Sequence, residues 1–192
     1  KRMLAYSSIA HAGFVLLGVV ALQQSGISAV LFYLLAYGLA TVGAFAVVSL
    51  VRERDPEGHV TAEAGELSQW AGLGKRNPWL AASMLVFLLS FAGIPLTAGF
   101  MGKFTVFTAA VQGGLGPLVV LAVLASAATA FFYVRLIVLM YFTEPEGEAT
   151  ITVDSDGMST VAIALGVIGT VVLGIVPGPV LDVLAGAATY LP

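Results

Sequence analysis

The chain has 192 residues, of which 59% are hydrophobic and only 10% are charged, and its formal net charge is −3. Because soluble domains average about 25% charged residues, this composition predicts an integral membrane protein, and the negative net charge argues against a nucleic-acid partner. The chain has no cysteine, which excludes disulfides, thiolate zinc sites and cysteine-ligated iron–sulfur clusters within it. With two histidines and no dense carboxylate cluster, we expect no metal ligands and no cofactor in this chain.

Five apolar segments are long enough to cross a membrane, which takes about 20 residues. They are Met3–Leu22, Ser28–Val51, Trp79–Val111, Leu115–Phe142 and Ser159–Val176. We therefore predict an all-α polytopic membrane protein, with residues 1–192 in one transmembrane domain and a short interfacial helix over Val180–Tyr190. Because the chain enters an apolar segment almost at Lys1, we interpret it as the C-terminal portion of a longer protein.

The third apolar segment contains a predicted helix break. It has 33 residues and would be about 50 Å long as one helix, against a hydrocarbon core of about 30 Å. Gly93-Ile94-Pro95 lies near its middle, and proline both lacks a backbone N–H and clashes with the preceding turn. We therefore predict two half-helices with a break at Gly93 and Pro95.

Lys103 is the only charged residue in Ser90–Phe107, and it follows Pro95 by eight residues. A charge at membrane depth costs about 2.5–3.5 kcal/mol on insertion scales. Beside an interrupted helix it indicates a site where an ion or a proton is handled. A lysine that snorkels to the nearest interface is the alternative interpretation.

The distribution of positive charge predicts the orientation of the chain. Of the eight Lys and Arg residues, six fall on one side of five spans, and these are Lys1, Arg2, Arg52, Arg54, Lys75 and Arg76. The positive-inside rule makes that side cytoplasmic, so that Arg52–Pro78 and Thr143–Met158 share it and the C-terminus is periplasmic in a bacterium. Within the longer loop, Leu67–Arg76 resembles an amphipathic surface helix, and a plain solvated loop is the alternative.

Polar side chains recur along one edge of four spans. They are Tyr6, Ser7, Ser8 and His11 in the first, Tyr33, Tyr37 and Thr41 in the second, Ser83, Ser90 and Thr97 in the third, and Ser126, Thr129 and Tyr133 in the fourth. Ordinary hydrogen bonds between helices would explain such stripes. Alternatively, the stripes line a hydrated path, in which His11 and Lys103 carry protons because both can switch between charged and neutral forms. Arg135 in the fourth span could snorkel to the interface or pair with a carboxylate on another helix. An arginine keeps its proton, so Arg135 would only tune such a path.

Two stretches of the chain resemble a known family. Lys1–Phe14, KRMLAYSSIAHAGF, and Leu88–Phe104, LLSFAGIPLTAGFMGKF, resemble the signature and the broken helix of the antiporter-like membrane subunits of respiratory complex I, the NADH-quinone oxidoreductase. Tyr33–Phe45 and Ala71–Trp79 fit the same family. The resemblance implies half of an inverted-repeat antiporter-like fold, namely helices ten to fourteen of a 14-helix subunit in the bacterial plasma membrane.

The same resemblance implies a function. It makes Lys103 the terminal lysine near the periplasmic exit of a proton path and His11 a member of its central polar axis. The chain would then be an enzyme only as a subunit of a proton-pumping translocase, with no redox centre of its own. Its partners would be protons, lipid and the other membrane subunits of a hetero-oligomeric complex I. A subunit of a multisubunit sodium/proton antiporter and a non-transporting scaffold are the alternatives.

Overall fold

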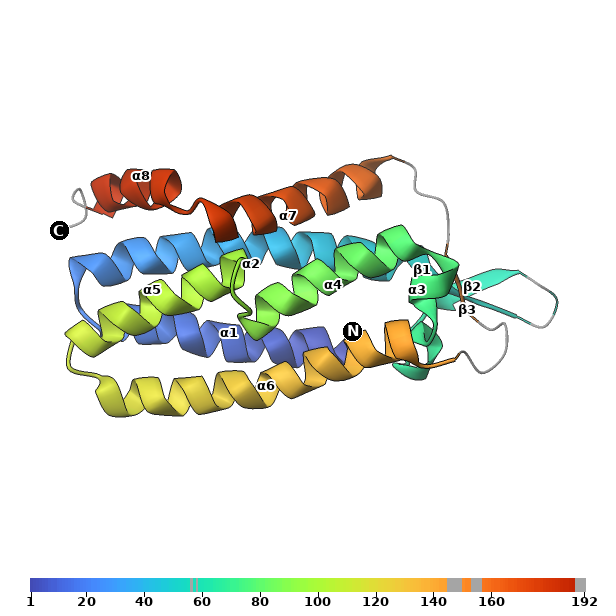
Figure 1. The fold of residues 1–192 in the computed structure, drawn as a ribbon, viewed down its shortest axis with the longest axis horizontal. Helices are drawn as coiled ribbons and strands as arrows, with labels where there is room; N and C mark the ends of the chain where they lie inside the picture. The colour runs from blue at the N-terminus through green and yellow to red at the C-terminus, as the bar shows by residue number, and fades with distance from the viewer. Residues whose placement is uncertain (56, 58, 145–149, 153–156, 189–192) are drawn as a thin grey trace.

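The structure is a computed structural model that describes residues 1–55, 57, 59–144, 150–152 and 157–188. Figure 1 shows an elongated bundle of helices with a small sheet at one end. The helices of the bundle are α1 (Arg2–Val20), α2 (Gln24–Leu50), α4 (Pro78–Ala92), α5 (Ala98–Gln112), α6 (Gly116–Phe142), α7 (Met158–Ile175) and α8 (Gly178–Ala188). Among the described residues, α1, α2, α6 and α7 are long and apolar enough to cross a membrane.

The third apolar segment forms two helices, α4 and α5, of 15 residues each. Helix α4 ends at Gly93, which has φ 80° and donates its N–H to the carbonyls of Leu89 and Ser90. A glycine in this left-handed conformation is a common helix terminator, because it carries no Cβ that would clash. The chain therefore leaves helical geometry two residues before Pro95. Helix α5 begins after Thr97, whose hydroxyl accepts from the Phe100 N–H, and the connection lies midway along the bundle (Figure 1).

Three short strands form a sheet that the all-α prediction did not include. They are β1 (Val51–Arg54), β2 (Val60–Glu63) and β3 (Thr150–Thr152), in the order β2-β1-β3 with both pairings antiparallel. Strand β1 follows α2 directly, and β3 lies between α6 and α7. The pairing of β1 with β3 confirms that the two long charged loops meet at one end of the bundle. Strands β1 and β2 pair within one loop, and β3 joins them from a distant one. Each strand has only three or four residues, which is too short to show a clear alternating pattern, and this is why the sequence did not predict them.

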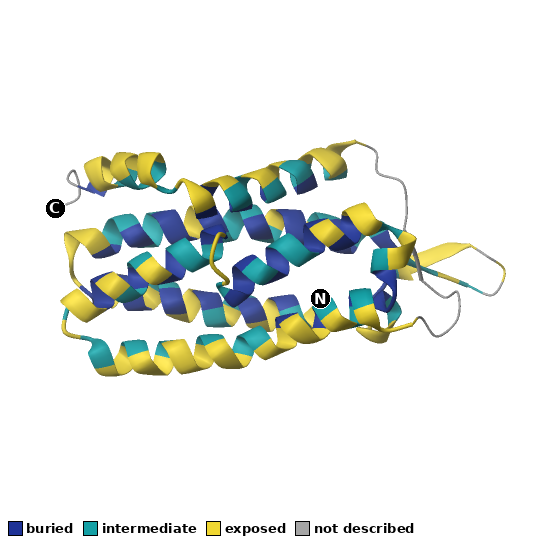
Figure 2. Ribbon diagram, viewed as in Figure 1, coloured by how far each residue is buried: buried dark blue, intermediate teal, exposed yellow. Residues whose placement is uncertain are grey.

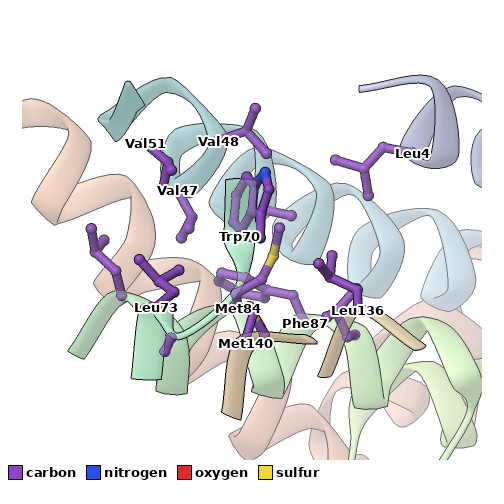
Figure 3. Packing of buried hydrophobic residues seen from close by; sticks show 14 of the residues in the cluster. Leu4, Val47, Val48, Val51, Trp70, Leu73, Met84, Phe87, Leu136 and Met140 are labelled. Carbon is purple, nitrogen blue, oxygen red and sulfur yellow. The ribbon is translucent and has the colours of Figure 1, made fainter. Parts of the chain in front are cut away.

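The segment Leu67–Arg76 is neither an amphipathic surface helix nor a solvated loop. It forms a 3₁₀ turn, Ser68–Trp70, and a short helix, α3 (Leu73–Arg76). Trp70 and Leu73 are buried in the core cluster that α2, α4 and α6 share. Figure 3 shows both side chains among those of Val47, Val48 and Met84. The segment thus covers the end of the bundle, because two large apolar side chains gain more from burial there than at a membrane surface.

The helices differ in how many of their residues are buried inside the bundle (Figure 2). Helix α2 has ten buried residues, and α6 has three among its 27. Helix α7 approaches the bundle through glycines, since a Cβ at Gly174 would lie only 2.4 Å from the Leu96 carbonyl oxygen. Close approach through small residues is typical of helices packed in membranes. The outward faces of α6 and α7 are apolar, with Leu121 and Ile168 among their exposed side chains.

The positive charges gather at the sheet end of the bundle. The Lys1 ammonium pairs with the Glu63 carboxylate, which ties the start of α1 to β2. The Gly72 N–H donates to the Leu139 carbonyl, which ties the long loop to α6. At the opposite end, the chain connects α1 to α2, α5 to α6 and α7 to α8, and these three connections contain no Lys or Arg.

Candidate functional site

Lys103 is buried inside the bundle, with 5% of its surface exposed. Its ammonium nitrogen donates to the carbonyl oxygens of Phe91, at 2.8 Å, and Ala92, at 3.2 Å. It also donates to the hydroxyl of Ser126 on α6, at 2.8 Å. The ring of Phe14 lies beneath it, with its centroid 5.2 Å from the nitrogen. The side chain therefore points into the protein, and it does not snorkel to an interface.

The end of α4 builds the acceptor side of this site. The last carbonyls of a helix have no partner within the helix and carry the negative end of its dipole, so they attract a cation. The φ of 80° at Gly93 favours glycine, and the close approach of the Lys103 side chain is a second reason for a residue without a Cβ. A Cβ at this position would lie 3.0 Å from Cδ and 3.2 Å from Nζ of Lys103. The helix break and the lysine thus form one structural unit.

Thr97 and Ser90 hold the break together. Thr97 caps α5, and its hydroxyl donates to the Ile94 carbonyl at 2.7 Å. The Ser90 hydroxyl, on α4, accepts from the Gly99 N–H of α5 at 3.0 Å. Thr97 is therefore part of the support of Lys103, through the geometry of the connection, and makes no hydrogen bond to Lys103 itself.

His11 lies within the same interior, with 2% of its surface exposed. Its Nδ1 is 2.8 Å from the Tyr33 hydroxyl, and its ring stacks on Tyr37 with centroids 4.3 Å apart. Its Nε2 is buried and has no hydrogen-bond partner among the described residues. A cavity of about 10 Å³ lies beside it, lined in part by Tyr33 and Ser90. That volume is close to the minimum that one water molecule needs.

His11 and Lys103 share two aromatic neighbours. The ring of Phe14 lies against both the imidazole, with centroids 5.8 Å apart, and the Lys103 ammonium. The ring of Phe91 packs edge-on against the His11 ring, with centroids 5.7 Å apart, and the Phe91 carbonyl accepts a hydrogen bond from Lys103. The structure therefore brings the two predicted proton carriers into one site. We call Lys103, His11, Tyr33, Tyr37 and Ser126 the inner polar site.

Hydrogen bonds extend from the inner polar site toward the sheet end. The Tyr37 hydroxyl donates to Ser8 at 2.9 Å, and the Ser8 hydroxyl donates to the Leu4 carbonyl. Ser7 and Tyr133, both buried, share a hydrogen bond between their hydroxyls. Thr41 is half-buried, and its hydroxyl has no hydrogen-bond partner among the residues that the structure describes.

Three of the predicted polar residues lie elsewhere. Tyr6, Thr129 and Arg135 line an outer groove of about 290 Å³ between α1 and α6. Tyr6 is 71% exposed and Arg135 is exposed as well. The prediction of one polar edge on α1 is therefore wrong for Tyr6. Successive helical residues are about 100° apart, so Tyr6 points away from the inward edge that Ser7 and His11 share.

The sequence analysis placed Tyr33 and Ser126 in the polar stripes without giving either one a contact with His11 or Lys103, and it did not include the two backbone carbonyls. Tyr33 was detectable, because it lies one helical turn before Tyr37 on the same edge. Ser126 carried a weaker signal, since a serine in a span is usually a packing residue. The carbonyls of Phe91 and Ala92 carried none, because every residue has a carbonyl.

The inner polar site can hold one positive charge without a negative partner. Helices α1, α2, α4, α5, α6 and α7 contain none of the eleven Asp and Glu residues of the sequence. Within the part of the chain that the structure describes, no group of three or more His, Asp and Glu side chains could hold a metal ion. A buried amine surrounded by neutral acceptors is suited to binding and releasing a proton.

Comparison with known proteins gives consistent matches along the chain. The family model described as "NADH:quinone oxidoreductase/Mrp antiporter, TM" matches residues 1–129. NADH-quinone oxidoreductase subunit N of Beutenbergia cavernae is 64% identical over 195 residues, covering 100% of this chain and 37% of that protein. Subunit N of Thermobifida fusca is 58% identical over 182 residues, covering 95% and 32%. The chain thus spans about a third of the length of the curated relatives it matches.

Solved structures share the fold. A chain of respiratory complex I from Thermus thermophilus with bound aureothin superimposes with a TM-score of 0.80 at 37% identity, covering 96% of this chain and 40% of that one. A chain of the Mrp complex from Dietzia sp. DQ12-45-1b superimposes with a TM-score of 0.78 at 23% identity, covering 98% and 42%. The second likeness is one of fold alone.

Proposed function

Because this chain belongs to the family of NADH:quinone oxidoreductase and Mrp antiporter membrane subunits, we propose that it is part of a proton-translocating subunit of complex I, of the subunit N type. Its identity with subunit N proteins supports the choice of complex. The observation that carries the proton-translocating role is the buried Lys103 ammonium, which donates to three uncharged acceptors at a helix break.

We propose five membrane crossings, with α4 and α5 together forming the third. Each of these helices has 15 residues and is about 22 Å long, which is too short for a hydrocarbon core of about 30 Å. Joined end to end, they reach across it, and the backbone exposed at the break is tolerated because it lines a protein interior. The fold would then be half of an inverted-repeat transporter.

The sheet end of the bundle is the cytoplasmic end in this proposal. Support comes from the six Lys and Arg residues in or next to the loops at that end and from their absence in the connections at the other end. The C-terminus, which follows α8, would be periplasmic. The protein would lie in the bacterial plasma membrane and work in a hetero-oligomer with other membrane subunits of complex I.

In this mechanism, His11 passes a proton to Lys103, which releases it toward the periplasm. Lys103 can hold the proton because the α4 carbonyls and Ser126 stabilise the ammonium. His11 would supply it through its Nε2, which is buried and has no hydrogen-bond partner among the described residues. Quinone reduction would take place in other subunits, with no redox centre in this chain, and it would be coupled to proton transfer through the membrane arm.

Two substitutions of Lys103 test the proposal in the complete complex, reconstituted in vesicles. Lys103→Ala should abolish most proton pumping while native gels show normal assembly. Lys103→Arg should fail as well, because the guanidinium keeps its proton. Near wild-type pumping by an assembled Lys103→Arg complex would refute the role of Lys103 as a proton carrier. Normal pumping by Lys103→Ala would instead support the non-transporting scaffold.

A sodium/proton antiporter subunit is the second candidate, because the family also includes Mrp antiporter subunits. The two candidates differ in what drives the transport. A complex I subunit should translocate protons only when NADH and quinone are supplied. An antiporter should exchange protons for sodium down a gradient, without any electron donor. Measuring both activities in vesicles that contain the purified assembly distinguishes them.

A further inference from the structure

We propose that Ser126 is a positioning residue for Lys103, which keeps the lysine fully hydrogen-bonded in both its charged and its neutral form. This inference rests on the proposed function, since it matters only if Lys103 gains and loses a proton. It assigns a specific task to a side chain of α6, a helix that carries neither the lysine nor the two carbonyls that hold it.

The charged form of Lys103 is completely satisfied in the structure. An ammonium has three N–H donors and no acceptor. Its three partners are the carbonyl oxygens of Phe91 and Ala92 and the hydroxyl of Ser126, at 2.8, 3.2 and 2.8 Å. In this form the Ser126 hydroxyl acts as an acceptor.

The neutral form has different needs. A neutral amine has two N–H donors and one lone pair, and the lone pair needs a donor. The carbonyls of Phe91 and Ala92 can only accept, so they remain partners of the two N–H groups. A hydroxyl can accept or donate, because its hydrogen rotates about the C–O bond. Of the three partners of Lys103, Ser126 is therefore the one that can reverse the direction of its hydrogen bond when the proton leaves.

The Ser126 hydroxyl is free to make this reversal. The hydroxyls of Ser83, Thr105 and Thr108 each donate to a carbonyl of their own helix, which fixes their direction. The Ser126 hydroxyl has no hydrogen-bond partner other than Lys103 within the described part of the chain. Without it, the neutral amine would keep a buried lone pair unpaired, and the ammonium would keep only two acceptors. The ammonium would lose more than the neutral amine, because hydrogen bonds to charged groups are the stronger ones. Lys103 would then take up a proton less readily, and proton transfer through it would slow.

The test compares three variants of the complete complex in vesicles, with proton pumping normalised to the assembled complex on native gels. Ser126→Ala should lower the pumping rate about tenfold, the effect of losing one hydrogen bond to a charged group. Ser126→Thr should keep most of the wild-type rate, because threonine retains the hydroxyl. Thr108→Val is the matched control, since it removes an exposed hydroxyl on α5 that, among the residues described, bonds only to the Phe104 carbonyl of its own helix.

Two results would overturn the inference. One is wild-type pumping by the assembled Ser126→Ala complex. The other is an equal loss in Ser126→Ala and Ser126→Thr, which would mean that the shape of the serine matters and its hydroxyl does not. Normalisation to assembled complex keeps the comparison valid if alanine lowers the yield. Lys103→Ala is measured in parallel: if it pumps normally, the proposed function itself fails, whereas an impaired Lys103→Ala beside a normal Ser126→Ala removes the role of Ser126 alone.

Discussion

Replacing Gly93 by alanine should damage the lysine site far more than it damages the fold. Gly93 has φ 80°, and a left-handed residue with a side chain costs about 1–2 kcal/mol. The added Cβ would also lie 3.0 Å from Cδ and 3.2 Å from Nζ of Lys103. The side chain would have to move, and losing one hydrogen bond to its charge costs about 1.5–3 kcal/mol.

Gly114 provides a matched control for this substitution. It also has φ 80°, but a Cβ there would meet nothing within 4 Å. Gly114→Ala therefore carries the backbone cost of about 1–2 kcal/mol without the contact with Lys103. The difference in pumping rate between the two variants therefore measures the effect on Lys103 alone. We expect Gly93→Ala to pump about tenfold to a hundredfold more slowly than Gly114→Ala.

The assay is proton pumping by reconstituted complex, normalised to the amount assembled, together with the temperature at which each complex dissociates. We expect both glycine variants to lower that temperature by similar small amounts. We expect only Gly93→Ala to lose pumping. Equal pumping by the two variants would mean that the close approach of Gly93 to Lys103 has no functional role, and the link between helix break and lysine would have to be abandoned.

Two further substitutions test other contacts. Tyr33→Phe removes the 2.8 Å hydrogen bond to His11 Nδ1 and should lower pumping by about tenfold, because an unsatisfied buried group costs about 1–3 kcal/mol; unchanged pumping would show that Tyr33 does not orient the imidazole. At the sheet end, the hydrogen bond from Lys1 holds the pKa of the Glu63 carboxyl below its ordinary value. The stability that this pair contributes is present above the ordinary carboxyl pKa of about 4 and is lost as the pH falls through the lowered pKa. Glu63→Gln should thus lower the free energy of unfolding at pH 7 by at most about 1 kcal/mol and leave it unchanged at strongly acidic pH. If the variant is still less stable than the wild type in acid, the Lys1–Glu63 ion pair is not the cause of the loss.

The sequence predicted those residues of the site that are polar but lie in apolar, membrane-spanning segments. Lys103 and His11 are polar groups in apolar segments, and such groups are stable only when they face protein. Their burial could therefore be expected, although their shared contacts with Phe14 and Phe91 could not. The interruption near Gly93 was also expected, since glycine and proline disrupt a long apolar run.

Two of the errors have a common physical origin in contacts between distant segments. Strand β3 has only three residues and pairs with β1 across nearly a hundred positions of sequence, so its own loop gives no sign of it. The burial of Trp70 depends in the same way on a core to which α1, α2, α4, α6 and α7 contribute. Tyr6 was misplaced because polar residues in a row were treated as one edge, while adjacent helical positions face different directions.

The uncharged surroundings of Lys103 determine which electric field the site produces. A lysine paired with a carboxylate alternates between a neutral pair and a negative charge. Here the three partners are two carbonyls and a hydroxyl, so under the proposed function the site would alternate between one positive charge and none. At an effective dielectric constant of about 20, a positive charge raises the energy of another cation 10 Å away by about 1.7 kcal/mol. A neighbouring cationic group would therefore be repelled while Lys103 is protonated and would not be repelled after Lys103 releases its proton. The protonation state of Lys103 would thus affect charged groups about one helix diameter away.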